Sequence, residues 1–259
     1  MLLQSGRFGV TFTTPADLSP FQWFDGSDSA SITASGGFIS QWADKSGNSR
    51  HLTQASGTNQ PQVSAAAVNG LDAVTFGGVD DYMTYDAGSD AISLASGLSM
   101  YAVVKNADAS IGASDYRRII TMRRSATGAG DFQSPNFLVS LDGAAGGWLS
   151  ILNGDATTLV DATAFGTSAQ RIAVIHDGTT GYLRRGGAQV DTGAMSAAGT
   201  MRYVRVGAAC KSTNNPPDVT TAVEFWSGLI CEVVVCLRAL SSGESDALEA
   251  YFATKWGVS

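Results

Sequence analysis

RIAVIHDGTTGYLR, residues 171–184, contains two short runs of apolar residues joined by a tight turn. Residues 171–176 and 181–184 have the length of short strands, and residues 177–180 between them are of the types that turns favour. This stretch therefore predicts a β-hairpin. Further short strands bounded by Gly, Asn or Asp are expected at residues 21–25, 39–44, 74–76, 98–104, 119–122, 137–141, 148–152, 203–207 and 229–237.

Many short strands at this spacing, with no helical stretches between them, are typical of two antiparallel sheets packed face to face. The composition agrees, because 44% hydrophobic and 15% charged residues with 30 Gly among 259 residues favour strands and turns. We predict an all-β, two-sheet antiparallel jelly-roll sandwich with a C-terminal α-helix. Residues 19–259 form the domain, and residues 1–18 form an N-terminal arm or an edge strand.

The C-terminal helix is predicted from its first turn and its last residue. Ser241 and Glu244 have the spacing of a capping box, in which each side chain binds the other's backbone N–H. Gly257 is expected to end the helix. An apolar stripe at helical spacing should pack on the sandwich: Ala247, Leu248, Tyr251 and Trp256.

Three cysteines occur, at positions 210, 231 and 236. Cys231 and Cys236 share one predicted strand, and a spacing of five places their side chains on opposite faces of the sheet. We therefore expect these two not to pair with each other. All three are expected to be free thiols that act as small core residues.

Several stretches resemble the laminin-G-like, concanavalin A-like lectin-glucanase jelly-roll family. They are QWADKSGN at 41–48, NGLDAVTF at 69–76, GVDDY at 78–82, the hairpin at 173–183 and WSGLICEVVV at 226–235 with RALS at 238–241. The resemblance covers residues 20–257 and implies the sandwich fold. The family includes lectins, glycan hydrolases and lyases, adhesion modules and modules of bacteriophage virions, so the fold does not decide the function.

Catalytic chemistry is not predicted. The hydrolases of the family carry Glu-x-Asp-x-x-Glu on one strand, because glycoside cleavage needs two carboxyl groups, and this sequence lacks the motif. Glu232 is expected instead to anchor a buried hydrogen bond. The two histidines, His51 and His176, do not have metal-ligand spacing. The loop carboxylates of residues 25–28 and 80–81 are of types that turns use, so no metal ligand and no cofactor is predicted.

A ligand-binding site is predicted from aromatic residues beside polar loops. Tyr116 with Arg117, and Trp148 after two glycines, are the candidates, because a flat ring beside hydrogen-bond donors can stack a pyranose. The loops at 106–118, 124–136 and 210–219 are expected to face the host or the medium.

Charge and hydropathy exclude several partners. The formal net charge of −7 disfavours nucleic acid, which clustered Lys and Arg bind. No apolar run reaches the length of a membrane span, and residues 1–7 do not form a secretory signal. We therefore expect a protein made in the host cytoplasm and located in the virion.

The predicted function is that of a non-enzymatic virion structural or accessory protein of a bacteriophage, as a head-decoration, head-fibre or tail-fibre subunit, with an added capacity for glycan or host-surface binding. Its expected partners are other virion proteins through the N-terminal arm, further copies of itself, and host or environmental glycans. The alternative is a free-standing carbohydrate-binding lectin module, and the third hypothesis is a polysaccharide-degrading enzyme.

Overall fold

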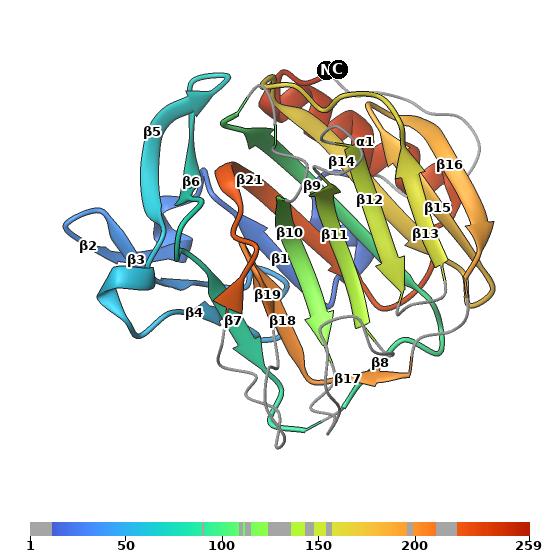
Figure 1. Cartoon of the computed structure of the whole chain (residues 1–259), viewed down its shortest axis with the longest axis horizontal. Coiled ribbons are helices and arrows are strands. Elements are labelled where there is room, and N and C mark those ends of the chain that lie inside the picture. Colours follow the sequence, from blue (N-terminus) through green and yellow to red (C-terminus); the bar gives the residue numbers. More distant parts are fainter. Residues whose placement is uncertain are drawn as a thin grey trace.

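Two layers of antiparallel strands lie face to face, and a C-terminal helix covers one of them (Figure 1). The computed structural model describes residues 12–89, 91–108, 111, 115–123, 136–142, 148–153, 157–195, 199–210 and 222–259. Residues 136, 148–153, 157, 158 and 210 are described by their backbone alone. This architecture confirms the predicted all-β sandwich with a C-terminal helix.

The layer beneath the helix, the helix-side sheet, is built from strands far apart in the sequence. Its order is β16 (Ala188–Ala194), β15 (Thr180–Arg185), β14 (Gln170–His176), β9 (Leu98–Asn106), β21 (Ser227–Cys236) and β1 (Gln22–Asp25). The predicted hairpin at residues 171–184 is the β14–β15 pair.

The second layer, the outer sheet, runs in the order β13 (Thr157–Asp161), β12 (Trp148–Asn153), β11 (Asn136–Asp142), β10 (Tyr116–Arg123), β18 (Tyr203–Val206), β7 (Met83–Asp86), β4 (Leu52–Thr53), β3 (Phe38–Trp42) and β2 (Ile32–Ser35). Strands β5 (Gln62–Val68) and β6 (Leu71–Gly77) connect β3 with β21, so the two layers are continuous. Short elements complete the fold: β8 (Ile92–Ser93), β17 (Thr200–Met201), β19 (Ala209–Cys210), β20 (Ala222–Val223) and the 3₁₀ turns Pro15–Leu18, Ser29–Ser31 and Gly57–Asn59.

The main core lies between the two sheets and follows the alternation of the strands. On β18, for example, Val204 and Val206 are fully buried in this core, while Tyr203 and Arg205, which alternate with them, point to the other face. Trp42 and Phe24 meet in the core with their ring centroids 5.7 Å apart. Burial of such large side chains removes much apolar surface from water and stabilises the sandwich.

Helix α1 (Ser242–Trp256) covers a second apolar layer on the far face of the helix-side sheet. The predicted capping box is present, and Gly257 ends the helix in the left-handed conformation at φ 64°. The buried stripe is centred on Leu248, Phe252 and Trp256. The predicted stripe shared Leu248 and Trp256 with the buried one. It also included Ala247 and Tyr251, which are only half-buried.

The prediction that Cys231 and Cys236 lie on opposite faces was wrong. Both are buried in the layer beneath the helix, because a register shift between Ile230 and Glu232 inserts a bulge into β21. A bulge adds one residue to a strand and so reverses the alternation beyond it. Both thiols are free, and burial raises the pKa of Cys231 to about 12 and that of Cys236 to about 11. The Cys210 side chain lies outside the described part of the chain.

The described end of the proposed arm lies on the helix side of the sandwich. The Phe12 ring meets the Tyr251 ring edge-on, with centroids 6.2 Å apart. Leu18 is buried in the same apolar layer, and its carbonyl accepts a hydrogen bond from Arg238. Residues 1–11, the larger part of the predicted N-terminal arm or edge strand, lie outside the described residues. None of the helices in the described ranges is long and apolar enough to cross a bilayer.

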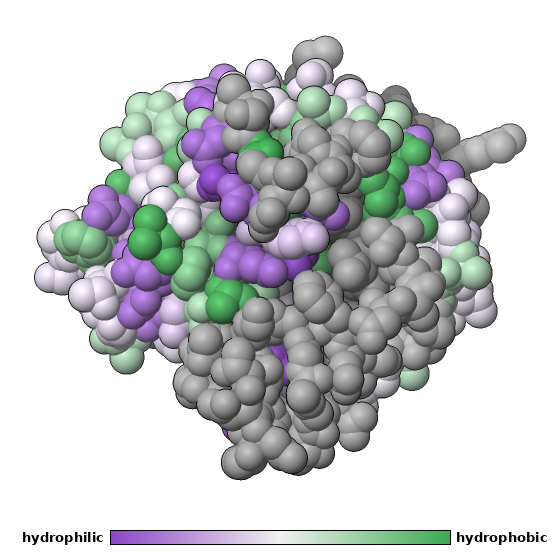
Figure 2. Space-filling model, viewed as in Figure 1, coloured by the Kyte–Doolittle hydropathy of each residue, from purple (hydrophilic) through white to green (hydrophobic). Residues whose placement is uncertain are grey.

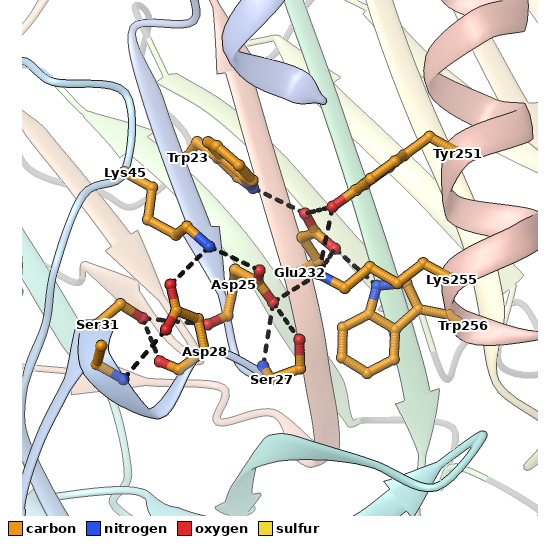
Figure 3. A network of polar contacts seen from close by, with 11 residues as sticks. Trp23, Asp25, Ser27, Asp28, Ser31, Lys45, Glu232, Tyr251, Lys255 and Trp256 are labelled. Atoms are coloured by element: carbon orange, nitrogen blue, oxygen red, sulfur yellow. Dashed lines mark hydrogen bonds and ion pairs between the residues drawn. The ribbon is translucent and has the colours of Figure 1, made fainter. Parts of the chain in front are cut away.

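A buried carboxylate fixes helix α1 to the helix-side sheet (Figure 3). Glu232 on β21 is 0% exposed. It accepts hydrogen bonds from the indole N–H groups of Trp23 and Trp256, both at 2.7 Å. The Tyr251 hydroxyl and the Lys255 ammonium also donate to it, at 3.1 and 2.8 Å. The prediction that Glu232 anchors buried hydrogen bonds is confirmed.

Asp25 on β1 stands directly opposite Glu232 in the strand register. Lys255 bridges the two carboxylates, with its Nζ 2.7 Å from Asp25. Burial and the neighbouring Asp25 charge raise the pKa of Glu232. Burial also acts to raise the pKa of Asp25, but the charge and hydrogen bond of Lys255, with bonds from Ser27 and Lys45, hold it below its ordinary value. The network therefore balances two buried negative charges with lysines from opposite sides.

Substitution of Glu232 by Gln should destabilise the protein by about 3–5 kcal/mol, because Lys255 would lose a buried charge partner. The measurement is urea denaturation followed by tryptophan fluorescence. Asp246→Asn is the matched control on the same helix, because the Asp246 side chain is 74% exposed and surface changes usually alter stability by about 0.5 kcal/mol or less. Equal losses for the two variants would contradict a central role of Glu232.

Candidate functional site

The outer face of the outer sheet carries a row of polar side chains that crosses six strands. Each member is next to a core-facing residue in its strand, as Thr53 follows Leu52 and Gln41 precedes Trp42, so it points away from the core. The strand registers align the members into one line, here called the polar row: Thr33, Gln41, Thr53, Thr84, Arg205 and Thr121.

The spacing and the contacts of the row give it a fixed shape. Neighbouring strands lie about 4.8 Å apart, so six positions span about 24 Å. The Arg205 Nε donates to the Thr84 hydroxyl at 3.1 Å, and its guanidinium lies over the Tyr82 ring at 4.5 Å. Thr84 is therefore held by its neighbour, and the threonines have few rotamers to lose because they are β-branched.

One end of the row is covered and the other is open. The chain that leaves β18 turns back over the sheet, where the carbonyls of Ala208 and Ala209 accept hydrogen bonds from Thr121 and Arg205. Those two polar side chains are consequently 1% and 3% exposed. The remaining members, Thr33, Gln41, Thr53 and Thr84, are exposed or half-buried and are called the open half of the polar row. Figure 2 shows hydrophilic and hydrophobic residues mixed over the coloured part of the view.

Beside the covered end, Arg118 is clamped between several groups. Its Nε pairs with the Glu224 carboxylate at 2.5 Å and its Nη1 donates to Ser140 at 2.9 Å, and the side chain is 1% exposed. Its guanidinium lies 4.9 Å from the Tyr116 ring centroid. Glu224 adopts a left-handed φ of 57°, which is costly for a non-glycine residue. Its carbonyl also accepts the Arg118 backbone N–H, so both ends of Glu224 hold Arg118.

The structure separates the predicted pair Tyr116 and Arg117. Arg117 stands opposite the core residue Leu141 and pairs with Asp108 at 2.8 Å at the open end of the sandwich. Tyr116 instead stacks with Arg118 on the outer face, because adjacent residues of a strand point to opposite sides.

The third predicted residue, Trp148, lies at the start of β12. In the backbone register it stands opposite Asp142, which stands opposite Tyr116 on the next strand. The backbone therefore places Trp148 and Tyr116 two strands apart in one line. The Trp148 side chain lies outside the described part of the chain, as do most residues of the predicted loops 124–136 and 210–219.

Sequence reasoning missed the polar row. A signal for it exists in the dipeptides Ile32-Thr33, Leu52-Thr53 and Met83-Thr84, in which an apolar residue precedes a threonine. Each dipeptide predicts a strand residue that faces away from the core. Their alignment depends on the pairing of strands distant in sequence, which a single sequence does not reveal.

The structure brings two carboxylates close together, but not in a cleft. Asp25 and Glu232 share the Lys255 ammonium and are 4% and 0% exposed. Glycoside cleavage requires carboxyl groups that a substrate and a water molecule can reach. The pair lies buried beneath helix α1 and is bridged by a lysine. Its role in the structure is therefore to hold the helix on the sheet.

The loop carboxylates have internal partners. Asp25 and Asp28 both pair with Lys45, at 2.9 and 2.7 Å. Asp81 accepts the Gly77 N–H, and burial raises its pKa. In the described ranges no group of three or more His, Cys, Asp or Glu side chains could hold a metal ion.

A hollow of ≈ 210 Å³ opens on the inner side of the β2–β5 region. Its described lining is mostly small or aliphatic and includes no aromatic ring: Gly26, Ser29, Ile32, Ala34, Val63 and Asp72. The hollow therefore lacks the flat surface on which a sugar ring stacks, and the outer face is the better candidate for ligand binding.

Comparisons with known proteins support the fold. No protein-family model matches the chain, and no curated protein matches its sequence. Solved structures do match. Trypanosoma rangeli sialidase in complex with 2,3-difluoro-KDN has a TM-score of 0.61 at 13% identity, over 99% of this chain and 35% of that chain. The receptor binding domain of botulinum neurotoxin D has a TM-score of 0.62 at 9% identity, over 94% of this chain and 56% of that chain.

A second structure of the serotype D domain contains N-acetylneuraminic acid, and it matches at a TM-score of 0.60 and 10% identity, over 95% of this chain and 56% of that chain. The chain thus spans about a third to just over half of the proteins that it resembles. At these identities the likeness establishes the lectin-like β-sandwich fold alone. None of the three is described as a laminin-G-like or bacteriophage protein.

Substitution of Glu224 by Gln should destabilise the protein by about 1–3 kcal/mol, because the buried Arg118 guanidinium loses a charged hydrogen-bond partner. Thermal unfolding followed by circular dichroism measures the effect. Asp246→Asn again serves as the control, since it removes an exposed carboxylate. Unchanged stability of the Glu224 variant would show that Glu224 does not hold the arginine.

Proposed function

We propose that this chain is a non-catalytic carbohydrate-binding module that recognises glycans on the outer face of its outer sheet. The observation that carries the proposal is the open half of the polar row, where hydroxyl and amide groups from four strands stand in line on an accessible face. Sugars present many hydroxyl groups in a fixed geometry. A rigid line of matching donors and acceptors suits them, because preorganised groups lose little entropy on binding.

The comparisons support this proposal in a general way. The serotype D neurotoxin domain was solved with N-acetylneuraminic acid, and the Trypanosoma rangeli sialidase with sialic acid. A β-sandwich of this shape is thus found in proteins whose structures were solved in complex with a sugar. The non-catalytic part of the proposal is supported by Asp25 and Glu232, which are the close carboxylate pair of the helix-side sheet and are buried beneath α1.

The double variant Gln41→Ala, Thr53→Ala should bind its glycan about 10-fold more weakly than the parent, because each lost hydrogen bond contributes about 0.5–1.5 kcal/mol. A printed glycan library would identify the ligand, and titration calorimetry would measure the affinity. Thr254→Ala is the matched control, since Thr254 is exposed on helix α1 at the opposite face. Absence of binding to every glycan, or equal losses for both variants, would contradict the proposed site.

We also propose, as a more specific role, that the module is an accessory subunit of a bacteriophage particle, attached to virion proteins or to further copies of itself through its N-terminal residues. The support is the resemblance to jelly-roll modules of virions together with the geometry of the described residues. Phe12 and Leu18 lie on the helix side, and the open half of the polar row lies on the opposite face. Attachment through the N-terminal segment would leave the glycan-binding face free.

Removal of residues 2–11 tests the attachment role, because it spares Leu18, whose burial supports the fold. Light scattering should give an oligomer for the full chain and a monomer for the shortened chain. Sedimentation with phage particles should likewise be lost. An oligomer that survives the truncation, or a full chain that neither self-associates nor sediments with particles, would contradict this role.

A further inference from the structure

We infer that the open half of the polar row binds an uncharged, linear oligosaccharide that lies across strands β2, β3, β4 and β7 and stacks one sugar ring on Phe38. The inference rests on the proposed carbohydrate-binding function and specifies the ligand class of that same face. It is carried by the charge, the spacing and the exposed aromatic ring of this region.

The region that forms the open half has no ionic side chains over long stretches. Residues 29–43 and 52–71, which contain β2, β3, β4 and β5, include no Asp, Glu, Lys or Arg. The whole chain has a net charge of −7, so an uncharged region of this size is distinct from the rest of the molecule. Its groups are hydroxyls and amides, which suit neutral sugars, whereas carboxylated or sulfated sugars are bound most strongly by Arg and Lys.

The ionic groups on β7 and β18 next to the open half have partners within the chain. Arg202 forms a bidentate pair with Asp86 at 2.6 and 2.9 Å, and this hydrogen bond lowers the Asp86 pKa. Arg205 bonds to Thr84 and to the Ala209 carbonyl and is 3% exposed. The edge of the open half therefore presents a neutralised pair and a covered guanidinium to an incoming ligand.

The spacing between neighbouring polar groups of the open half matches the spacing between units of an extended sugar chain. Four positions on neighbouring strands are spaced by about 4.8 Å, which is close to the length of one pyranose unit. Thr33, Gln41 and Thr53 are linked by direct register pairs, and Thr53 pairs in turn with Thr84. A linear oligosaccharide that crosses the strands would meet one polar side chain at each unit, so about four units would fill the line.

Phe38 supplies an apolar surface on the same face. It is 42% exposed and precedes the core residue Ile39, so it points outward like Gln41. Its register partners are Ser35 and Gln62, which surround the ring with hydrogen-bonding groups. A single exposed phenylalanine is ordinary on protein surfaces. Its position beside the polar row gives it the combination of ring and donors that binds pyranoses.

The strand that carries Phe38 is held in place by the residues on its core-facing side. Ile39 and Trp42 of β3 are both 0% exposed, and the Trp42 ring packs on Phe24. The ring and the amide of Gln41 are consequently mounted on a fixed backbone. Sites on strands anchored in the core keep their geometry better than sites on loops.

The test is titration calorimetry of the full chain with uncharged, β-linked gluco- and galacto-oligosaccharides from one to six units. A sialylated trisaccharide serves as the anionic probe. Affinity should rise with length up to about four units and then level off, and the anionic probe should bind more weakly than neutral chains of its own length. Phe38→Ala should lower the affinity about tenfold or more, whereas Phe38→Trp should retain binding.

Val190→Ala is the matched control, because Val190 is 38% exposed on β16 of the helix-side sheet and should leave the affinity unchanged. Melting temperatures of all three variants should equal that of the parent. Affinity independent of chain length, preference for the anionic probe, or full binding by the Phe38→Ala variant would overturn this inference, while glycan binding as such would stand. Failure to bind any glycan in the printed library would overturn the proposed function as well.

Discussion

The burial of the Glu232 carboxylate is the constraint on which the rest of the molecule depends. A fully buried anion is very costly unless donors surround it, and here the donors come from two elements other than its own. Trp23 belongs to β1, Tyr251, Lys255 and Trp256 belong to helix α1, and Glu232 itself lies on the central strand β21. The first strand, the last strand and the helix must therefore come together as a unit. Asp25 and Lys45 extend this unit into the loop that follows β3.

The same arrangement makes the two faces of the sandwich different. Helix α1 and residues 12–18 cover the helix-side sheet with an apolar layer that includes Leu18, Phe252 and Trp256. The outer sheet has no helix over it in the described part of the chain, and its outward residues include the threonines, the arginine and the glutamine of the polar row. One face is thus used for stability and the other is available for recognition. The chain after β18 divides the outer face again, because it covers Arg205 and Thr121 and leaves Thr33, Gln41 and Thr53 accessible.

Local patterns in the sequence predicted local structure well. The turn at residues 177–180, the capping box of Ser241 and Glu244, and the buried role of Glu232 were all predictable, because each depends on residues near one another or on a single isolated charge. The faces of Cys231 and Cys236 were not, because the bulge in β21 arises where that strand changes partner from β6 to β1 along one edge. The site could not be predicted in the same way. The structure places Tyr116 on the outer face with Arg118 as its neighbour, and its role in binding stays a prediction. The polar row requires registers between strands that one sequence does not specify.

The pairing of β1 with β21 joins Gln22 to Val235. Strand β1 therefore cannot pair until β21, more than 200 residues later, has left the ribosome. During synthesis the aromatic residues of β1 and the apolar layer that the helix later covers remain without their partners, and loop closure over such a distance is slow. The nascent chain thus exposes apolar strands until β21 has been made. Chaperone binding and low temperature during expression should consequently matter more for the yield of this protein than its final stability does.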